Sequence, residues 1–259
     1  KPKNLKISKK THFLNVPKLS VDGAESLVEE IRNFHTKHKE SIQAKKVGVY
    51  GYLINTLAGD SNSNLEVDEQ KLLKNIVKFA AQPTLMGLAA EYIGQIPAIH
   101  GYSLNHVEKN AGLGALKGSQ LYHRDVGCDR LLHMIVQITD CYEGDGPFTF
   151  IDSENSKRLI KSLGHQAGKA SDQDVNKNLE EGSVRKNMGP AGLVVFVNPD
   201  RCFHFGARNT TGERIQLIIS YAPPNEAIEG NCCLYLNKYR KYFNQNELSL
   251  PERHLLKYY

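Results

Sequence analysis

Two short segments of the chain contain the residue types that bind transition metals. In the run SQLYHRDVG, His123 and Asp125 are two residues apart. On an extended segment, residues i and i+2 point to the same side, so an imidazole and a carboxylate converge on one point without special folding. A second histidine would complete one face of an octahedral ion and leave three positions open. This arrangement suits iron(II) that must take up a substrate and dioxygen.

The best candidate for the third ligand is His204, in the run NPDRCFHFGARN. It follows the apolar run 191–198 and a Pro-Asp turn, so we expect it at the mouth of a β core. Arg214 comes ten residues later and opens another apolar, strand-like run. A guanidinium there is costly to bury unless it meets an anion, and its planar fork can bind a carboxylate through two hydrogen bonds. A dicarboxylate co-substrate would satisfy it.

Other polar residues compete for roles near this site. His133 lies in a strand-like segment, where we expect it to line the pocket or to be satisfied in the core and not to bind the metal. His106 could contact the co-substrate or the substrate, although the face of a strand can slip by one residue. Thr149 could donate a hydrogen bond to the co-substrate, or be a plain polar strand position. Arg208 lies in the turn after His204 and is expected to meet substrate or solvent.

The N-terminal third of the chain is expected to be helical. Apolar residues recur at three- and four-residue steps over residues 22–34, with Asp22 as the N-cap, and again over residues 72–80. Pro83 predicts the first turn of a third helix, and Gly94 predicts its end. The stretch 58–64 is rich in Gly, Asp, Ser and Asn, which predicts a polar loop.

From about Ile96 the pattern becomes that of β-strands. Segments of this kind separated by turn signals favour an all-β barrel or sandwich, so the sequence predicts helices followed by a curled antiparallel β core. The polar segment 165–186 has almost no large apolar residue and is interpreted as a mobile lid or a disordered loop. The predicted strands are the start of the β region near residues 98–110 and the runs 131–139, 146–151, 191–198 and 213–223.

Composition and charge limit the class of protein. The 259 residues, 40% of them hydrophobic, are enough for one sizeable globular domain, and no apolar run approaches the length needed to cross a bilayer. The five cysteines include no CxxC pair, which favours reduced thiols over a disulfide framework or a zinc site. Reduced thiols are typical of a cytoplasmic protein, which is the location that we expect. The net charge of +5 comes from scattered lysines and indicates a solvated surface, or an anionic small-molecule substrate. A nucleic-acid ligand is not expected.

The sequence resembles the phytanoyl-CoA dioxygenase-like family of 2-oxoglutarate oxygenases. The resemblance lies in three segments that occur in this order: HRD, GPFTFI and GLVVFVNPDRCFHFGARNTTGERIQLIISYAPP. The resemblance covers roughly residues 83–224. It implies a double-stranded β-helix of the jelly-roll or cupin-like kind, with an N-terminal helical layer on the outer face. It also implies that His123, Asp125 and His204 bind Fe(II) and that Arg214 binds the far carboxylate of 2-oxoglutarate.

We expect one oxygenase domain over residues 1–259. Residues 1–95 would be its mainly helical flank, 96–224 its β-helix core and 225–259 a C-terminal extension. The sequence departs from the usual pattern of the family in two ways. The region after GPFTFI reads IDSENS and lacks the usual histidine, and the chain has no tryptophan. These departures leave the predicted iron ligands in place but weaken any transfer of a substrate.

The implied reaction is hydroxylation of an unactivated C–H bond with O2 as oxidant and with release of succinate and CO2. Ascorbate would serve as the reductant in vitro. Related halogenases have a small residue in place of Asp125, so its presence favours hydroxylation. We expect the substrate to be a small metabolite or an anionic sugar or lipid headgroup. The alternatives are an oxygenase acting on a macromolecule, a cupin-like metal enzyme without 2-oxoglutarate, and a non-catalytic module.

Overall fold

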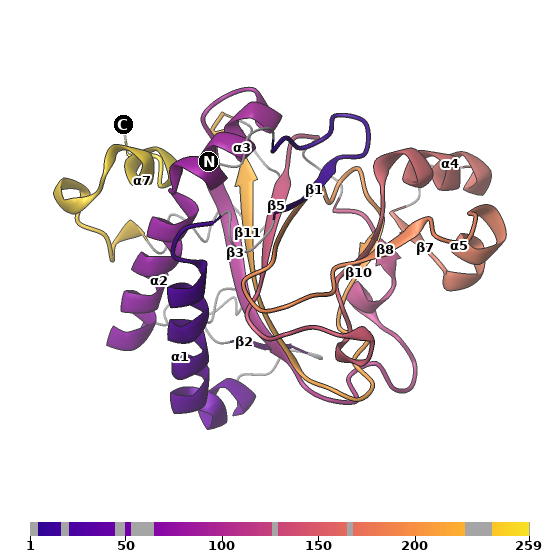
Figure 1. Ribbon diagram of the computed structural model, residues 1–259, viewed down its shortest axis with the longest axis horizontal. Coiled ribbons are helices and arrows are strands. Elements are labelled where there is room, and N and C mark those ends of the chain that lie inside the picture. Colours follow the sequence, from indigo (N-terminus) through magenta and orange to yellow (C-terminus); the bar gives the residue numbers. More distant parts are fainter. Residues whose placement is uncertain are drawn as a thin grey trace.

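The computed structural model describes residues 5–16, 21–44, 50–52, 65–125, 129–164, 168–225 and 240–258. Two antiparallel sheets face each other, and helices cover their outer faces (Figure 1). The larger sheet has the order β1 (Phe13–Val16), β9 (Val194–Val197), β5 (Leu132–Gln137), β11 (Arg214–Ala222), β3 (Ala98–Val107) and β2 (Tyr50–Tyr52). The smaller sheet has the order β7 (Lys169–Ala170), β4 (Tyr122–His123), β10 (His204–Phe205), β6 (Thr149–Ile151) and β8 (Val184–Lys186). This is the double-stranded β-helix with flanking helices that the sequence predicts.

Strand alternation divides the larger sheet into a helix-facing side and an inner side. On β11, Ile215, Leu217 and Ile219 are buried in the large core between sheet and helices. Ile218 instead packs with Ile135 in the smaller core between the two sheets. Because successive side chains of a strand point to opposite faces, the even-numbered residues of β11 point inward, toward the second sheet. Arg214 is therefore on the inner side.

The helical layer on the larger sheet consists of α1 (Ala24–Ala44), α2 (Val67–Ala80), α3 (Pro83–Ile93) and the short α7 (Leu250–Leu255). Helix α3 begins at Pro83 and ends at Gly94, which adopts the left-handed conformation with φ of 86°. Helix α1 begins at Ala24, after a turn in which Gly23 has φ of 71°, so the expected N-cap at Asp22 is wrong by one position. None of the helices in the described ranges is long and apolar enough to cross a membrane.

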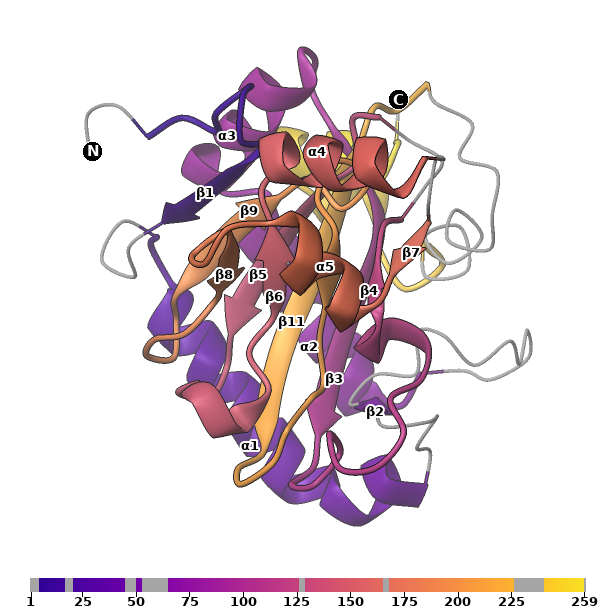
Figure 2. The same ribbon diagram turned by 90° about the vertical axis from the view of Figure 1, so that its right-hand side faces the viewer.

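A second helical layer lies over the smaller sheet. Figure 2 shows α4 (Ser153–Leu163) and α5 (Asp172–Asn178) in front of this sheet. The expectation of a disordered loop over 165–186 is therefore wrong for residues 168–186, whereas that of a mobile lid stays a prediction, and residues 165–167 lie outside the described ranges. Two features order this segment: β7 pairs with β4, and Val175 packs into an apolar cluster.

Two predictions remain untested by this fold. The polar loop predicted over residues 58–64 lies outside the described ranges. The assignment of the whole chain to one oxygenase domain also stays a prediction.

Candidate metal centre

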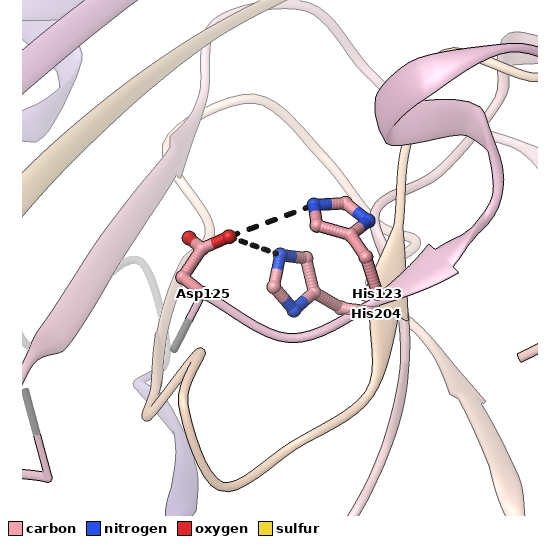
Figure 3. Close-up of side chains that lie close together, drawn as sticks. All are labelled: His123, Asp125 and His204. Atoms are coloured by element: carbon pink, nitrogen blue, oxygen red, sulfur yellow. Dashed lines mark ion pairs between the residues drawn. The ribbon is translucent and has the colours of Figure 1, made fainter. Parts of the chain in front are cut away.

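Strands β4 and β10 bring together two histidines that are far apart in the sequence. His123 and His204 are direct partners in this antiparallel pair, and their ring centroids are 4.2 Å apart. Asp125 follows β4, and its backbone N–H donates to the carbonyl oxygen of Pro199 at 3.1 Å. Figure 3 shows the three side chains pointing toward one another. The structure thus brings together the three residues whose types and spacing predict a metal site.

One oxygen of Asp125 faces both imidazoles. Its Oδ1 lies 3.6 Å from Nε2 of His123 and 3.8 Å from Nε2 of His204 (Figure 3). The three ligand atoms all lie within 4.8 Å of one another. Neighbouring ligands of an octahedral ion with bonds of about 2.1 Å lie roughly 3 Å apart, so each of these two Oδ1–Nε2 distances would have to shorten by less than about 1 Å.

Backbone carbonyls orient both imidazoles. Nδ1 of His123 donates to the carbonyl oxygen of Leu121 at 2.9 Å, and Nδ1 of His204 donates to that of Cys202 at 3.0 Å. In a neutral imidazole the other nitrogen then carries the lone pair, and in both residues that atom is the Nε2 that faces Asp125. Metal-binding histidines in proteins are commonly held by such a second hydrogen bond.

The electrostatics of the site keep Asp125 and His204 in their metal-binding forms. Burial by itself raises the pKa of Asp125, but the hydrogen bond from His133 and the neighbouring imidazoles outweigh it and hold this pKa well below its usual range. Burial lowers the pKa of His204 to about 4. A carboxylate and a neutral imidazole are therefore present at neutral pH. Imidazole nitrogen and carboxylate oxygen together form a donor set that fits iron(II).

Arg214 lies on the inner side of the larger sheet and is completely buried. It donates a hydrogen bond from Nη1 to the carbonyl oxygen of Gly146. It also lies close enough to Cys141 to lower the pKa of that thiol, although burial raises the pKa overall to about 11. A buried guanidinium thus lies on the inner side, and its role as the co-substrate anchor stays a prediction.

A row of buried amide side chains lies beside Arg214. Gln216 is the direct partner of Asn105 on β3 and of Gln137 on β5, so the three side chains share the inner face. Gln137 donates to the backbone carbonyl of Asn187 at 2.7 Å. Within the described part of the chain, the amide oxygens of this row and both polar side-chain atoms of Asn187 lack hydrogen-bond partners. Buried polar groups are normally paired, so this lining suits a polar ligand.

The structure does not bring His106 to the centre. Its partner on β11 is Ile215, which packs against the helices, so His106 also points to the helical layer. There Nδ1 of His106 is 3.2 Å from Nε2 of His35 on α1, and its Nε2 is 3.1 Å from Glu213. The expected contact of His106 with a co-substrate or substrate therefore has no support in its position.

Thr149 also lies apart from the inner surface. Its neighbours Phe148 and Phe150 both pack in the core between the sheets, so alternation along β6 points Thr149 the other way. Its hydroxyl donates to the carbonyl oxygen of Pro147 at 2.9 Å. The hydrogen bond predicted from Thr149 to the co-substrate is therefore not supported.

Two further residues contact the centre or its rim. His133 lines the interior, as its strand pattern predicts, but its hydrogen bond to Asp125 was not foreseen. Arg208, for which a contact with substrate or solvent is expected, binds both carboxylate oxygens of Asp172 at 2.9 and 3.0 Å and lies over the ring of Phe205. The only signal in the sequence for the contact between His133 and Asp125 is the strand pattern that points His133 into the pocket.

Neither a protein-family model nor a curated protein matches this sequence. Solved structures do match its fold. EctD from S. alaskensis with bound Fe is 17% identical, with a TM-score of 0.56 over 85% of this chain and 75% of that one. HygX from Streptomyces hygroscopicus with nickel, 2-oxoglutarate and hygromycin B bound is 15% identical, with a TM-score of 0.52 over 85% and 86%.

A third similar structure is the non-heme alpha ketoglutarate dependent epimerase SnoN from nogalamycin biosynthesis. It is 14% identical, with a TM-score of 0.52 over 85% of this chain and 84% of that one. At these identities the likeness concerns the fold. The fold is thus one that hosts iron and 2-oxoglutarate in proteins of known structure.

Proposed function

We propose that this protein is an Fe(II)- and 2-oxoglutarate-dependent dioxygenase. The observation that carries the proposal is the convergence of two Nε2 atoms and one carboxylate oxygen within 4.8 Å, from two strands and the segment that follows one of them. Two histidines and one carboxylate leave half of an octahedral coordination sphere open. Open positions are needed for catalysis, whereas a purely structural metal site is usually closed.

In this proposal His123, Asp125 and His204 hold the iron, and Arg214 binds the far carboxylate of 2-oxoglutarate. The buried amides of Gln137, Gln216 and Asn187 support the second assignment, because a polar co-substrate would give them hydrogen-bond partners. When bound, the iron would supply the activation of dioxygen that couples decarboxylation of 2-oxoglutarate to oxidation of a substrate. The role of the protein is to position these groups and to shield them from water.

We propose further that the chain is of the phytanoyl-CoA dioxygenase-like kind and hydroxylates an unactivated C–H bond. The carboxylate of Asp125 supports hydroxylation over halogenation, since a halide would need its coordination position. SnoN, by contrast, is described as an epimerase, so this fold also accommodates another outcome. Analysis of the substrate-derived product is therefore part of the test.

The proposed substrate is a small metabolite or an anionic sugar or lipid headgroup. HygX is described with hygromycin B bound, which shows that the fold can admit a small molecule of this size. Lys169 is exposed and lies directly opposite His123 on β7, so a cation is present at the rim of the centre. Cys141 and Cys202 are free thiols, in keeping with the proposed cytoplasmic location.

The test is succinate release under air from purified protein supplied with Fe(II), ascorbate and 2-oxoglutarate. We expect slow turnover without a substrate, which is lost in His123→Ala and is stimulated by the right compound from a panel of neutral and anionic metabolites. If Arg214→Ala keeps full activity, a cupin-like metal enzyme without 2-oxoglutarate replaces the proposal. If the protein binds neither iron nor 2-oxoglutarate, the interpretation as a non-catalytic module replaces the proposal.

A further inference from the structure

The second carboxylate oxygen of Asp125 has its own partner. Nε2 of His133 lies 3.2 Å from Oδ2, and Nδ1 of His133 lies 2.9 Å from the hydroxyl of Ser220. We propose that His133 and Ser220 are positioning residues that make Asp125 bind the metal through Oδ1 alone. This inference rests on the proposed iron site, but it concerns residues that are not themselves ligands.

Three neighbouring strands hold Asp125 in place. His133 and Ser220 are direct partners across β5 and β11, and both point to the inner side of the larger sheet. His133 also pairs with Val197 at the end of β9. That strand leads to Pro199, whose carbonyl oxygen accepts the backbone N–H of Asp125. The backbone and the carboxylate of Asp125 are thus anchored to the same part of the rigid sheet, although Asp125 lies outside any strand.

The direction of the hydrogen bonds follows from the partners. A carboxylate can only accept, so Nε2 of His133 carries the proton and donates it to Oδ2 of Asp125. Nδ1 of a neutral His133 is then an acceptor, and the hydroxyl of Ser220 is the donor that it needs. Ser220 therefore selects the useful tautomer of His133, because the other tautomer would point a lone pair at the carboxylate.

This chain of hydrogen bonds affects how many coordination positions remain open. A carboxylate can bind an ion through one oxygen or two. Oδ2 is held by His133, whereas Oδ1 faces the Nε2 atoms of His123 and His204. If Asp125 bound through Oδ1 alone, it and the two histidines would use three positions and leave three, which is the number that a co-substrate bound through two atoms and dioxygen would require. Binding through both oxygens would remove one of them.

The competing interpretation is a core histidine that only fills space. Two substitutions separate these interpretations: His133→Leu keeps much of the volume but removes the donor, and His133→Gln keeps an amide donor of similar reach. His106→Gln is the matched control, since His106 is a histidine that also has two polar partners, but it is buried and points to the helical layer. Fe(II) is titrated into each apo protein without oxygen, and Co(II) absorption spectra report the coordination geometry.

We expect His133→Leu to raise the Kd for Fe(II) by roughly 10–100-fold and to change the Co(II) spectrum. His133→Gln should stay within a few-fold of the wild type in Kd and keep the spectrum, and His106→Gln should change neither. Equal Kd values and spectra for wild type and both His133 variants would overturn the inference and leave the proposed function standing. A Gln variant as impaired as the Leu variant would also overturn it, because packing would then be the cause.

Ser220→Ala provides a second test if His133→Leu does not fold. Loss of one hydrogen bond should weaken Fe(II) binding roughly 3–10-fold. Where His133→Leu does fold, adding Ser220→Ala to it should have no further effect on the Kd, since Ser220 acts through His133. An unchanged Kd in the single variant would contradict the role of Ser220. If the wild-type protein itself does not bind Fe(II), the proposed function fails and this inference fails with it.

Discussion

Arg214→Leu is the substitution that separates co-substrate binding from metal binding. The side chain of Arg214 is completely buried, so water cannot replace it as a partner for a carboxylate. It begins β11 on the inner side, whereas the three proposed iron ligands lie on or directly after strands of the other sheet. We therefore expect the variant to bind Fe(II) like the wild type and to lose affinity for 2-oxoglutarate.

The size of the loss follows from the hydrogen bonds involved. A guanidinium can bind a carboxylate through two charge-assisted hydrogen bonds, each contributing about 1.5–3 kcal/mol. Removing both costs about 3–6 kcal/mol, which raises the Kd for 2-oxoglutarate by roughly two to four orders of magnitude. The Kd of Arg214→Lys for 2-oxoglutarate should lie between those of the wild type and Arg214→Leu, because an ammonium is a point charge without the planar fork. Anaerobic calorimetry with Mn(II)-loaded protein measures all three constants.

Arg32→Leu is the matched control for this experiment. Arg32 also donates to a backbone carbonyl, that of Ile138 at 2.9 Å, but from helix α1 on the opposite side of the sheet. Its replacement should leave the Kd for 2-oxoglutarate unchanged. A Kd for Arg214→Leu within threefold of the wild type would refute the assignment of Arg214 as the anchor.

Three further predictions concern stability. Burial lowers the pKa of His35 from 6.5 to about 4, so the folded state resists protonation and the free energy of unfolding falls as pH drops below 6.5. In urea titrations, His35→Gln should reduce the loss of this free energy between pH 7.5 and 5 by about 2 kcal/mol. Equal losses in the wild type and the variant would contradict this prediction. Gly112→Ala should lower Tm by about 2–10 °C, because its Cβ would lie 2.4 Å from the backbone of Arg208, and an unchanged Tm would count against the close packing of these loops. Asp172→Ala should lower the free energy of unfolding in urea by about 1 kcal/mol or less, since the carboxylate is half-exposed. A larger decrease would contradict this and show that the ion pair between Asp172 and Arg208 orders the whole α5 segment.

The parts of the fold that are predictable from the sequence are those with a strong local signal. Pro83 and Gly94 mark the ends of α3 because each has a backbone preference that suits only one end of a helix. The run from Arg214 predicts β11 because its apolar residues are β-branched or large. Helix α4 was not predicted, although Asp152 caps it by accepting the N–H of Asn155. Its apolar stripe is narrow, so periodicity gives little warning of it.

His123 and Asp125 are predictable as a pair because they are two residues apart, and His204 is predictable because it follows a clear apolar strand. The misplacement of His106 has a different cause. Strand β3 contains a register irregularity opposite Ser220 and Tyr221, and such a shift reverses which side chains face the interior. A similar limit applies to His133, whose bond to Asp125 depends on a strand and a loop meeting in space. Neither relation can be read from one sequence.

The measurement that tests the central claim most directly follows the oxygen atoms. The protein is supplied with Fe(II) and 2-oxoglutarate under isotopically labelled dioxygen, with catalase present to remove peroxide, and succinate is analysed by mass spectrometry. An oxygenase of the proposed class places one labelled atom in each succinate, and His204→Ala, which lacks one of the three converging ligand atoms, should form none. Succinate without label, or equal labelling by the His204→Ala variant, would contradict the account.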